Sequence, residues 1–445
     1  MLPAQNREGE AETILVTGAS GYIASQLVPR LLQAGKKVRC LARHPQHLQE
    51  RSWFGRVESV KGDLFDPQSY PQALEGVSTA FYLVHSMASG GTNYTERDLQ
   101  AARQFAQACQ AAGVRHIIYL GGLADSNGGI APHLRSRIQT GAALRSSAVP
   151  VTELRAGVIV GPGSISFEMI RFLTEQFPII ICPQWMKNFS QPIAIQNVID
   201  YLMAGLETYP GECRVFEIGG SQVMTYADTM LHYARLRGLR RRTLILPFNP
   251  AWLLATLMPW FTPVPASITH PLVGGLKSDS RVSNPEALMT FPQVSPLDYE
   301  RSVQVCLEQL HPRLVEPLWR FHVSRPRSRK HAGFCFLQQR FDFDGIGDVQ
   351  VITRELIQSG HWQEDLSHKV NGNPEILLMN INKNDRAYWL ELYPNKKSLV
   401  VSLLFAPKGL KGFLPWYLGF FRVTFWKLIR RSSRMMRNQH VFQVK

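Results

Sequence analysis

The stretch ILVTGASGYIASQLVPRLLQAG, residues 14–35, constrains the fold of this chain more than any other segment. A short apolar run leads into a turn and then a helical pattern, with Gly18, Gly21 and Ala24 at three-residue spacing. Glycine at the first position permits a sharp turn, and glycine at the second lets backbone N–H groups approach a pyrophosphate. The helix start adds its dipole and unpaired donors. The stretch therefore predicts a dinucleotide-binding turn, and the alternative is a glycine turn with a structural role alone.

Short apolar runs alternate with helical patterns through the first part of the chain, which is typical of a parallel sheet with right-handed crossovers. We therefore expect an α/β fold built on a Rossmann-type, doubly wound parallel sheet. Residues 1–160 are predicted to form the nucleotide-binding core. Residues 161–322, with irregular helices and Pro-rich connections, are predicted to complete this unit with a small lobe. Residues 323–330, VSRPRSRK, are predicted to be a linker.

Beyond the linker, the apolar pattern changes to a period of two, which predicts antiparallel strands. The pair RAYWLELYPNKKSLVVSLLF is expected to turn at residues 394–397. A long helix is expected from about residue 413 to 437. Residues 331–445 are therefore predicted to be a separate C-terminal α+β domain, an antiparallel sheet with a long terminal helix. This sheet and helix are a candidate module for an apolar ligand or a membrane surface.

Charge and cysteine usage limit the partners and the compartment of this chain. The formal net charge is +15, and residues 392–445 contain no Asp or Glu but 11 Lys and Arg. This excess indicates either a solvated basic face or contact with anionic phospholipid, and no recognisable nucleic-acid module accompanies it. The six cysteines are scattered singly, without metal-ligand spacing, so free thiols in a cytoplasmic, reducing compartment are expected.

The tail, residues 412–438, is rich in aromatic residues and then basic. It is too short and too charged to span a bilayer, which needs about 20 apolar residues. The prediction favours a helix buried across the sheet. The alternative is a helix at the inner face of the membrane, with aromatic rings at headgroup level and arginines on anionic lipid. That alternative rests on Trp416, Tyr417, Trp426, Arg430, Arg431, Arg434 and Arg437.

Residues at the ends of the second and third strands indicate which dinucleotide is bound. A site for NAD(H) usually places Asp or Glu after the second strand, but this chain has CLARHP, with Arg43 at the strand tip. A guanidinium suits a 2′-phosphate, so NADP(H) is predicted in preference to NAD(H). The alternative is a solvated surface arginine. Asp63, in the segment GDL that ends the third strand, is expected to reach the adenine amino group.

The segments TGASGYIA, ARHP, GDL, LVHSM and RAGVIVGPGS together make the first ~320 residues resemble an atypical extended short-chain dehydrogenase/reductase, in the NmrA-like, NAD(P)H-binding branch. The chain is similar to a bacterial two-domain group whose C-terminal domain is of unknown function. The resemblance implies three groups of cofactor-binding residues. These are Gly18, Ser20, Gly21, Tyr22 and Ile23 at the pyrophosphate, Arg43, Asp63 and Leu64 at the adenosine end, and Leu83, Val84 and His85 beside the nicotinamide ribose.

The chain departs from this family at the hydride-transfer centre, where the family carries Ser and Tyr-x-x-x-Lys. Gly121 and Gly122 stand at the serine strand end, and Ser126 is the nearest substitute hydroxyl. His133 and Arg137 stand where Tyr and Lys are expected. A histidine with an ordinary pKa near 6.5 could donate a proton at neutral pH, and the arginine one turn later could hold the ribose or a substrate carboxylate.

Two hypotheses follow from these residues. In the first, the protein is an oxidoreductase that uses NADPH to reduce a carbonyl-type group of a small apolar substrate, with His133 as proton donor. In the second, catalysis is lost and NADP(H) is a structural or sensing ligand.

Several other residues near the predicted centre admit two interpretations. Tyr94 and Tyr119 are predicted to be packing residues rather than replacement acids. Arg155 is predicted to pair with Glu153 or another internal acid, and its alternative is a wall of the substrate pocket. His85 and Met87 either line that pocket or fill space.

Overall fold

The structure is a computed structural model that describes residues 12–413 with internal gaps. The gaps are residues 50, 86–93, 125–129, 209–210, 248–249, 263, 265, 316–326, 332–333, 343–347, 368–375, 381–386, 396–397, 407 and 412. Among the described residues, no helix is long and apolar enough to cross a membrane.

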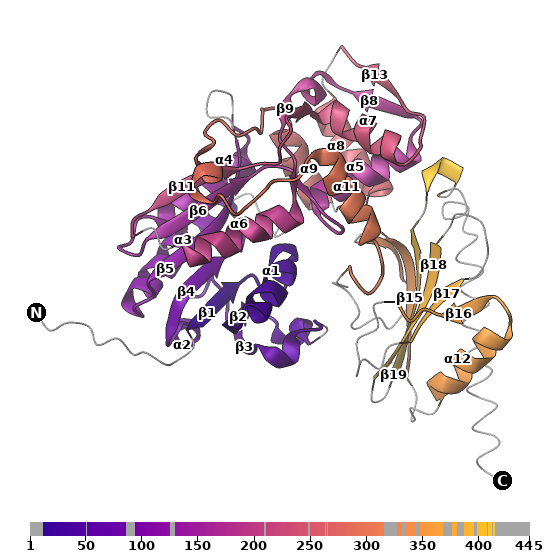
Figure 1. Ribbon diagram of the computed structural model, residues 1–445, viewed down its shortest axis with the longest axis horizontal. Coiled ribbons are helices and arrows are strands. Elements are labelled where there is room, and N and C mark those ends of the chain that lie inside the picture. Colours follow the sequence, from indigo (N-terminus) through magenta and orange to yellow (C-terminus); the bar gives the residue numbers. More distant parts are fainter. Residues whose placement is uncertain are drawn as a thin grey trace, which may run out of the picture.

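A seven-stranded parallel sheet forms the core of the amino-terminal part (Figure 1). Its strand order, β11-β6-β5-β4-β1-β2-β3, reverses between β1 and β4, which is the switch point of a doubly wound sheet. The predicted Rossmann-type fold is confirmed. The strands are β1 (Thr13–Thr17), β2 (Lys37–Ala42), β3 (Glu58–Lys61), β4 (Val77–Tyr82), β5 (His116–Gly122), β6 (Val151–Ala156) and β11 (Arg214–Ile218).

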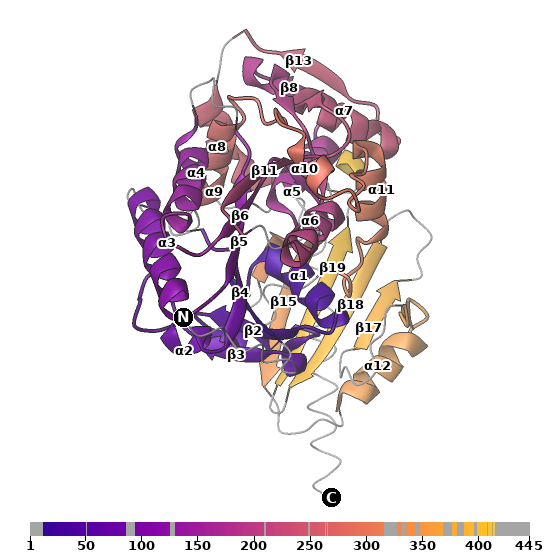
Figure 2. The same cartoon turned by 60° about the vertical axis from the view of Figure 1, so that its left-hand side comes forward.

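Helices cover both faces of this sheet because its strands are apolar on both sides (Figure 2). Val16 and Phe81 pack on the side of α1 and α6, whereas Leu15 and Tyr82 pack on the side of α3. The helices of this layer are α1 (Tyr22–Gln33), α2 (Pro71–Leu74), α3 (Tyr94–Ala111), α4 (Pro132–Leu144) and α6 (Ile195–Glu207), with the 3-10 turns η1 (Pro45–Leu48) and η2 (Phe54–Arg56).

A smaller lobe, which begins after β6, stands beyond the carboxyl ends of the strands (Figure 1). The start of its helix α7 is defined by a capping box, in which Thr225 and Asp228 satisfy each other's backbone N–H groups. The elements of the lobe are β7 (Ile159–Val160), α5 (Ile165–Gln176), β8 (Ile179–Cys182), η4 (Gln184–Lys187), β9 (Phe189–Ser190), β10 (Ile193–Ala194), β12 (Met224–Thr225), α7 (Tyr226–Leu236), β13 (Arg242–Ile245), α8 (Ala251–Phe261), α9 (Ala266–Gly275) and α11 (Tyr299–Glu308). The short helix α10 (Glu286–Thr290) returns to the seven-stranded sheet, where Ala287 is buried in the core beside β11.

The C-terminal part is an antiparallel six-stranded sheet in the order β14-β15-β19-β18-β17-β16, as the period of two predicted. Strands β18 and β19 pair from Asn395 and Ser398 outward, which confirms the predicted pair. Helix α12 lies beside this sheet (Figure 1). The elements are β14 (Arg327–His331), β15 (Phe334–Asp342), α12 (Asp348–Gln358), β16 (Trp362–Glu364), β17 (Ile376–Asn380), β18 (Ala387–Asn395) and β19 (Ser398–Ala406).

The segment predicted as a linker, residues 323–330, is in part a strand. Residues 327–330 belong to β14 and pair with β15, so the predicted linker ends earlier than expected. Its first part, residues 323–326, lies outside the described residues. The aromatic and basic tail also lies outside them from residue 414 onward, so its burial and its membrane contact stay predictions.

The C-terminal domain is fastened to the lobe at Glu175, a buried acid near the end of α5. Its carboxylate accepts hydrogen bonds from the Tyr233 hydroxyl at 2.8 Å and from the Gly409 backbone N–H at 2.6 Å. Arg237 pairs with it at 2.7 Å. Nearby, the Phe172 and Phe413 rings meet edge to face, with centroids 5.6 Å apart. A buried acid with three donors thus joins the two parts, since an unpaired charge there would be costly.

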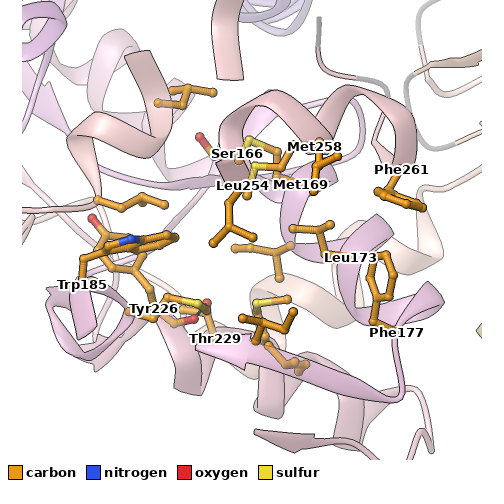
Figure 3. Close-up of a pocket in the computed structure, with 18 of the residues that line it drawn as sticks. Ser166, Met169, Leu173, Phe177, Trp185, Tyr226, Thr229, Leu254, Met258 and Phe261 are labelled. Carbon is orange, nitrogen blue, oxygen red and sulfur yellow. Dashed lines mark hydrogen bonds between the residues drawn. The ribbon is translucent and has the colours of Figure 1, made fainter. Parts of the chain in front are cut away.

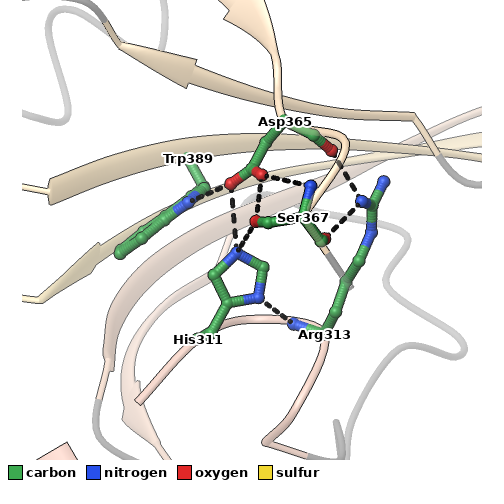
Figure 4. Close-up of polar contacts among 5 residues, drawn as sticks. All are labelled: His311, Arg313, Asp365, Ser367 and Trp389. Atoms are coloured by element: carbon green, nitrogen blue, oxygen red, sulfur yellow. Dashed lines mark hydrogen bonds and ion pairs between the residues drawn. The ribbon is translucent and has the colours of Figure 1, made fainter. Parts of the chain in front are cut away.

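A second junction links the segment after α11 to the C-terminal sheet (Figure 4). The Asp365 carboxylate receives the Trp389 indole N–H at 3.1 Å and the His311 Nε2 at 3.0 Å. Arg313 donates to the carbonyl oxygens of Asp365 and Ser367. Burial raises the pKa of Asp365, but the hydrogen bonds outweigh it and hold that pKa at about 2.

Candidate functional site

The turn between β1 and α1 has the shape that its glycines predict. Gly18 has φ +64°, and a Cβ added there would stand 2.9 Å from the Leu83 carbonyl oxygen and 3.0 Å from Val84 Cγ2. The Gly21 N–H donates to the Gly18 carbonyl oxygen at 2.8 Å, which closes the turn. Only glycine fits at position 18 without both strain and a clash.

The start of α1 offers free donors to an anion. Gly21 is the N-cap residue, no side chain caps the helix, and no acidic residue occupies its first turn. Ser20 and Gly21 are exposed, while Tyr22 and Ile23 are half-buried. The first N–H groups of a helix have no partner within it and favour negative charge. These residues therefore fit a pyrophosphate.

Two polar contacts hold the turn against its neighbours. The Thr17 hydroxyl donates to the Phe81 carbonyl oxygen at 3.0 Å and accepts the Leu83 N–H at 3.2 Å. This joins the ends of β1 and β4, so the predicted residues Leu83, Val84 and His85 follow directly beside the turn. Arg51 donates to the Ser20 carbonyl oxygen at 3.0 Å. The sequence gives no signal for this last contact, because Arg51 lies in an irregular connection.

The residues expected at the adenosine follow β2 and β3, at the same sheet edge, because the carboxyl ends of parallel strands meet there. Arg43 directly follows β2 and is exposed, and its guanidinium has no ion pair or hydrogen bond with any described residue. Asp63, after β3, is half-buried and accepts the Phe65 N–H at 3.1 Å. Leu64 is buried beside it. The arrangement brings together a cation and an acid at the edge where an adenosine 2′-phosphate and adenine would lie.

The chemistry side of the site lies between β5 and α4. A Cβ added to Gly122 would stand 2.9 Å from Arg137 Cδ and 3.0 Å from Leu134 Cδ2. The missing side chain on β5 therefore makes room for the arginine that follows one helical turn after His133. Arg137 fits here only because position 122 has no side chain, and neither residue supplies a hydroxyl. Ser126, the nearest alternative hydroxyl, and Met87 lie outside the described residues.

His133 is buried in the first turn of α4, and its Nδ1 has no hydrogen-bond partner among the described residues. Its opposite edge faces α9, because a Cβ on Gly275 would stand 2.5 Å from His133 Cε1. Burial, with a smaller effect of Arg137, lowers the pKa of His133 to about 4. The ring is therefore neutral at pH 7, whereas the sequence analysis assumed an ordinary pKa near 6.5.

His85, which follows β4, lies in the same region as His133 and Arg137. Its side chain keeps contact with solvent, but the surrounding protein desolvates the ring, and Arg137 and His133 add their effects. Its pKa falls to about 3. The effects of Arg137 and His133 on this pKa mean that the three side chains lie in one region, while their roles stay predictions.

Two further residues near the centre have structural roles. The buried Tyr119 hydroxyl donates to the Arg137 carbonyl oxygen at 3.0 Å, and burial raises its pKa to about 12. Arg155 pairs with the buried Glu153 at 2.6 Å, which confirms the internal ion pair. Arg145 pairs with the same acid. Gly141 leaves space for Glu153, so this cluster fixes where α4 sits.

An apolar cavity of about 290 Å³ lies in the lobe (Figure 3). Phe177 and Phe261 stand at one end, and Trp185 and Tyr226 at the other. Its wall includes Leu272 and Leu276 on either side of Gly275, the residue that His133 contacts. The lining residues are Val158, Ser166, Met169, Ile170, Leu173, Phe177, Ile179, Ile180, Ile181, Trp185, Met186, Tyr226, Thr229, Met230, Leu254, Leu257, Met258, Phe261, Leu272 and Leu276.

Known proteins agree with this geometry. Residues 18–168 match a family model described as NAD(P)H-binding. A (4-alkanoyl-5-oxo-2,5-dihydrofuran-3-yl)methyl phosphate reductase from Streptomyces griseus is 29% identical over 235 residues, which cover 51% of this chain and 74% of that protein.

Solved structures show the same fold. The triphenylmethane reductase of Citrobacter sp., in complex with NADP(H), has a TM-score of 0.53 at 20% identity and covers 66% of this chain and 99% of its own. MoeE5, with UDP-glucose and NAD, has a TM-score of 0.50 at 17% identity and covers 66% and 97%. Residues 18–168 therefore match the NAD(P)H-binding family model, and the amino-terminal part of this chain has the fold of these two solved structures.

Proposed function

We propose that this protein is an NADPH-dependent reductase that acts on a carbonyl-type group of a small apolar molecule. The observation that carries the proposal is the adjacency of two sites. His85, His133 and Arg137 share one region, His133 lies against Gly275, and Leu272 and Leu276 beside that glycine line the apolar cavity. A substrate in the cavity would present its polar end to this group.

The preference for NADPH rests on Arg43. Its guanidinium is exposed at the tip of β2 without a protein partner among the described residues, and the carboxylate typical of a site for NAD(H) is missing there. The pyrophosphate would be bound by the backbone N–H groups at the start of α1, with Gly18 setting the turn. When bound, NADPH supplies the hydride.

Residues of the chain would then stabilise the negative charge that develops on the carbonyl oxygen and supply it with a proton. The Arg137 guanidinium can stabilise that oxygen by charge and hydrogen bonding. His133 can donate a proton only in its imidazolium form. Because burial lowers its pKa to about 4, that form is scarce at pH 7 and grows as the pH falls.

The test is the pH dependence of NADPH oxidation on a panel of apolar aldehydes and ketones. If His133 is the donor, kcat/KM rises about tenfold for each pH unit lowered between pH 8 and 6, and His133→Asn abolishes this slope. NADPH affinity stays within about twofold in the variant, because the ring lies away from the phosphates. An unchanged slope in His133→Asn would remove the residue from the mechanism.

A non-catalytic NADP(H)-binding protein is the second candidate function, and the paired change of Gly122 and Arg137 favours it. No hydroxyl stands at that position of β5, and His133 is neutral at pH 7. This candidate predicts tight NADPH binding with no oxidation of the coenzyme by any member of the panel. Turnover that depends on Arg137 would exclude it.

A further inference from the structure

The apolar cavity opens at one face of the lobe, between β8 and α8. Ile179, Ile181 and Leu257 line the cavity, and yet 53%, 45% and 42% of their surfaces are exposed. A side chain that does both lies at the mouth. Figures 1 and 2 show β8 and β13 at the end of the molecule opposite to α12, so the C-terminal sheet does not cover this face.

Exposed apolar side chains also stand on β13 and on the solvent side of α8. Strands β8 and β13 are parallel, and Ile181 pairs with Leu244, which is 51% exposed. On α8, Trp252 and Trp260 are 73% and 75% exposed. Large apolar side chains grouped on a protein surface mark a candidate contact site. The β8, β13 and α8 surface with these residues is called the docking face below.

The charge around the docking face is of one sign. Residues 229–278 contain no Asp or Glu. Arg240 and Arg242 are exposed at the start of β13, and neither makes an ion pair with a described residue. Arg242 pairs in register with Ile179 at the mouth. Exposed cations beside tryptophans fit an anionic lipid surface, whereas two copies of this chain would bring arginine against arginine.

We propose that the docking face binds an anionic lipid bilayer and that the cavity opens into it. The substrate of the reductase would then be an apolar molecule dissolved in the membrane, an inference that rests on the proposed function. Helix α8, with 11 residues, is about 16 Å long, so it lies in the interface rather than across it. Its two tryptophans sit at headgroup level, as interfacial tryptophans do.

The experiment is co-sedimentation of the full chain with vesicles of phosphatidylcholine and phosphatidylglycerol in equal parts, and with phosphatidylcholine alone. The double variant Trp252→Ser/Trp260→Ser removes apolar contact from the docking face. Its control is Met289→Ser/Leu366→Ser, because those side chains are 71% and 64% exposed elsewhere. The docking-face variant should bind mixed vesicles at least about tenfold more weakly than the unaltered protein. The control variant should bind them within about twofold of the unaltered protein.

Charge is tested in the same assay. Arg240→Glu/Arg242→Glu should weaken binding to mixed vesicles about tenfold or more, since each basic side chain near an anionic surface is worth about 1 kcal/mol. Lys37→Glu/Arg56→Glu, two exposed cations of the nucleotide-binding part, should leave it within about twofold. Added salt should also weaken the binding of the unaltered protein to mixed vesicles, because it screens the charges. Hydrogen exchange with vesicles present should slow in residues 250–261.

Three results would overturn the proposal. One is unchanged vesicle binding in both docking-face variants, which would assign the contact to another part of the chain. The second is no binding to mixed vesicles by the unaltered protein. The third is a dimer of the unaltered protein that Trp252→Ser/Trp260→Ser dissociates without any effect of lipid. NADPH affinity is measured separately on the unaltered protein and on each variant. If the unaltered protein does not bind NADPH, the proposed function is overturned and the lipid contact still stands.

Discussion

The predicted nucleotide crevice, around the turn at Gly18, and the lobe cavity are built in opposite ways. In the crevice, the backbone forms the site, and a single glycine with φ +64° decides its shape. In the cavity, side chains from α5, β8, η4, α7, α8 and α9 form most of the wall, and nearly all are apolar. The crevice therefore depends on few residues and tolerates little substitution. The cavity depends on the volume that its side chains leave free, so substitutions there can change which ligand fits.

The largest effect is expected at the turn. Gly18→Ala puts a Cβ 2.9 Å from the Leu83 carbonyl oxygen, in a left-handed conformation. NADPH affinity should fall about 100-fold or more, because the turn must move from the position in which its N–H groups point at the pyrophosphate. Isothermal calorimetry measures this.

The control for Gly18→Ala is Gly35→Ala. Gly35 has φ +71°, but a Cβ there meets nothing within 4 Å. This variant should lose about 1–2 kcal/mol of stability through strain and keep its affinity for NADPH. Equal losses of NADPH affinity in the two variants would contradict a special role of the turn.

Filling the cavity should separate the two sites. Leu173→Trp, on α5, reduces the free volume of about 290 Å³. Turnover of apolar carbonyl compounds should fall about tenfold or more, with NADPH affinity within about twofold of the unaltered protein. Thermal unfolding checks that the variant still folds. Unaltered turnover in a folded Leu173→Trp protein would show that substrates bind elsewhere.

The next effect concerns coenzyme selection at Arg43. Arg43→Ala should weaken NADPH binding about tenfold, because a charge-assisted pair with a phosphate contributes about 1.5–3 kcal/mol. NADH, which lacks the 2′-phosphate, should bind as before. Arg39, which is paired with Glu58 at 2.7 Å, offers the control Arg39→Ala. A parallel loss for both coenzymes in Arg43→Ala would make the effect structural.

The smallest effect is expected far from both sites, at Asp365. Its pKa in the folded protein is held at about 2, below the roughly 3.9 of an unfolded chain. A lowered pKa stabilises the fold above pH 4, and this contribution is lost as the pH falls from 4 towards 2. Asp365→Asn should therefore cost about 1–2 kcal/mol at pH 7 and less at pH 3. Urea unfolding at both pH values measures it, and an equal cost at both would refute the assignment.

The part of the fold that follows from short-range patterns could be predicted from the sequence. The turn at Gly18, the strand and helix alternation and the β18–β19 pair each depend on residues close together in the chain. The expected cofactor residues were chosen because the strand ends share one edge of the sheet. Resemblance identified His133 and Arg137 as candidates, and their roles stay predictions.

The rest depends on tertiary contacts that no local pattern encodes. The low pKa of His133 comes from burial against α9, more than 130 residues later in the chain. The space that Gly122 leaves for Arg137 requires knowledge of how α4 packs on β5. Arg51 reaches the turn from an irregular connection. The cavity could not be foreseen either, because its wall is assembled from separate segments whose apolar residues look like ordinary core.

The most direct test of the account is calorimetry of the purified chain with NADPH, NADP⁺ and NADH. The account holds that the N–H groups at the start of α1 bind the pyrophosphate and that Arg43 selects the phosphorylated coenzyme. It predicts one binding site for NADPH, with NADH bound about tenfold more weakly. No detectable binding of NADPH or NADP⁺ would contradict it.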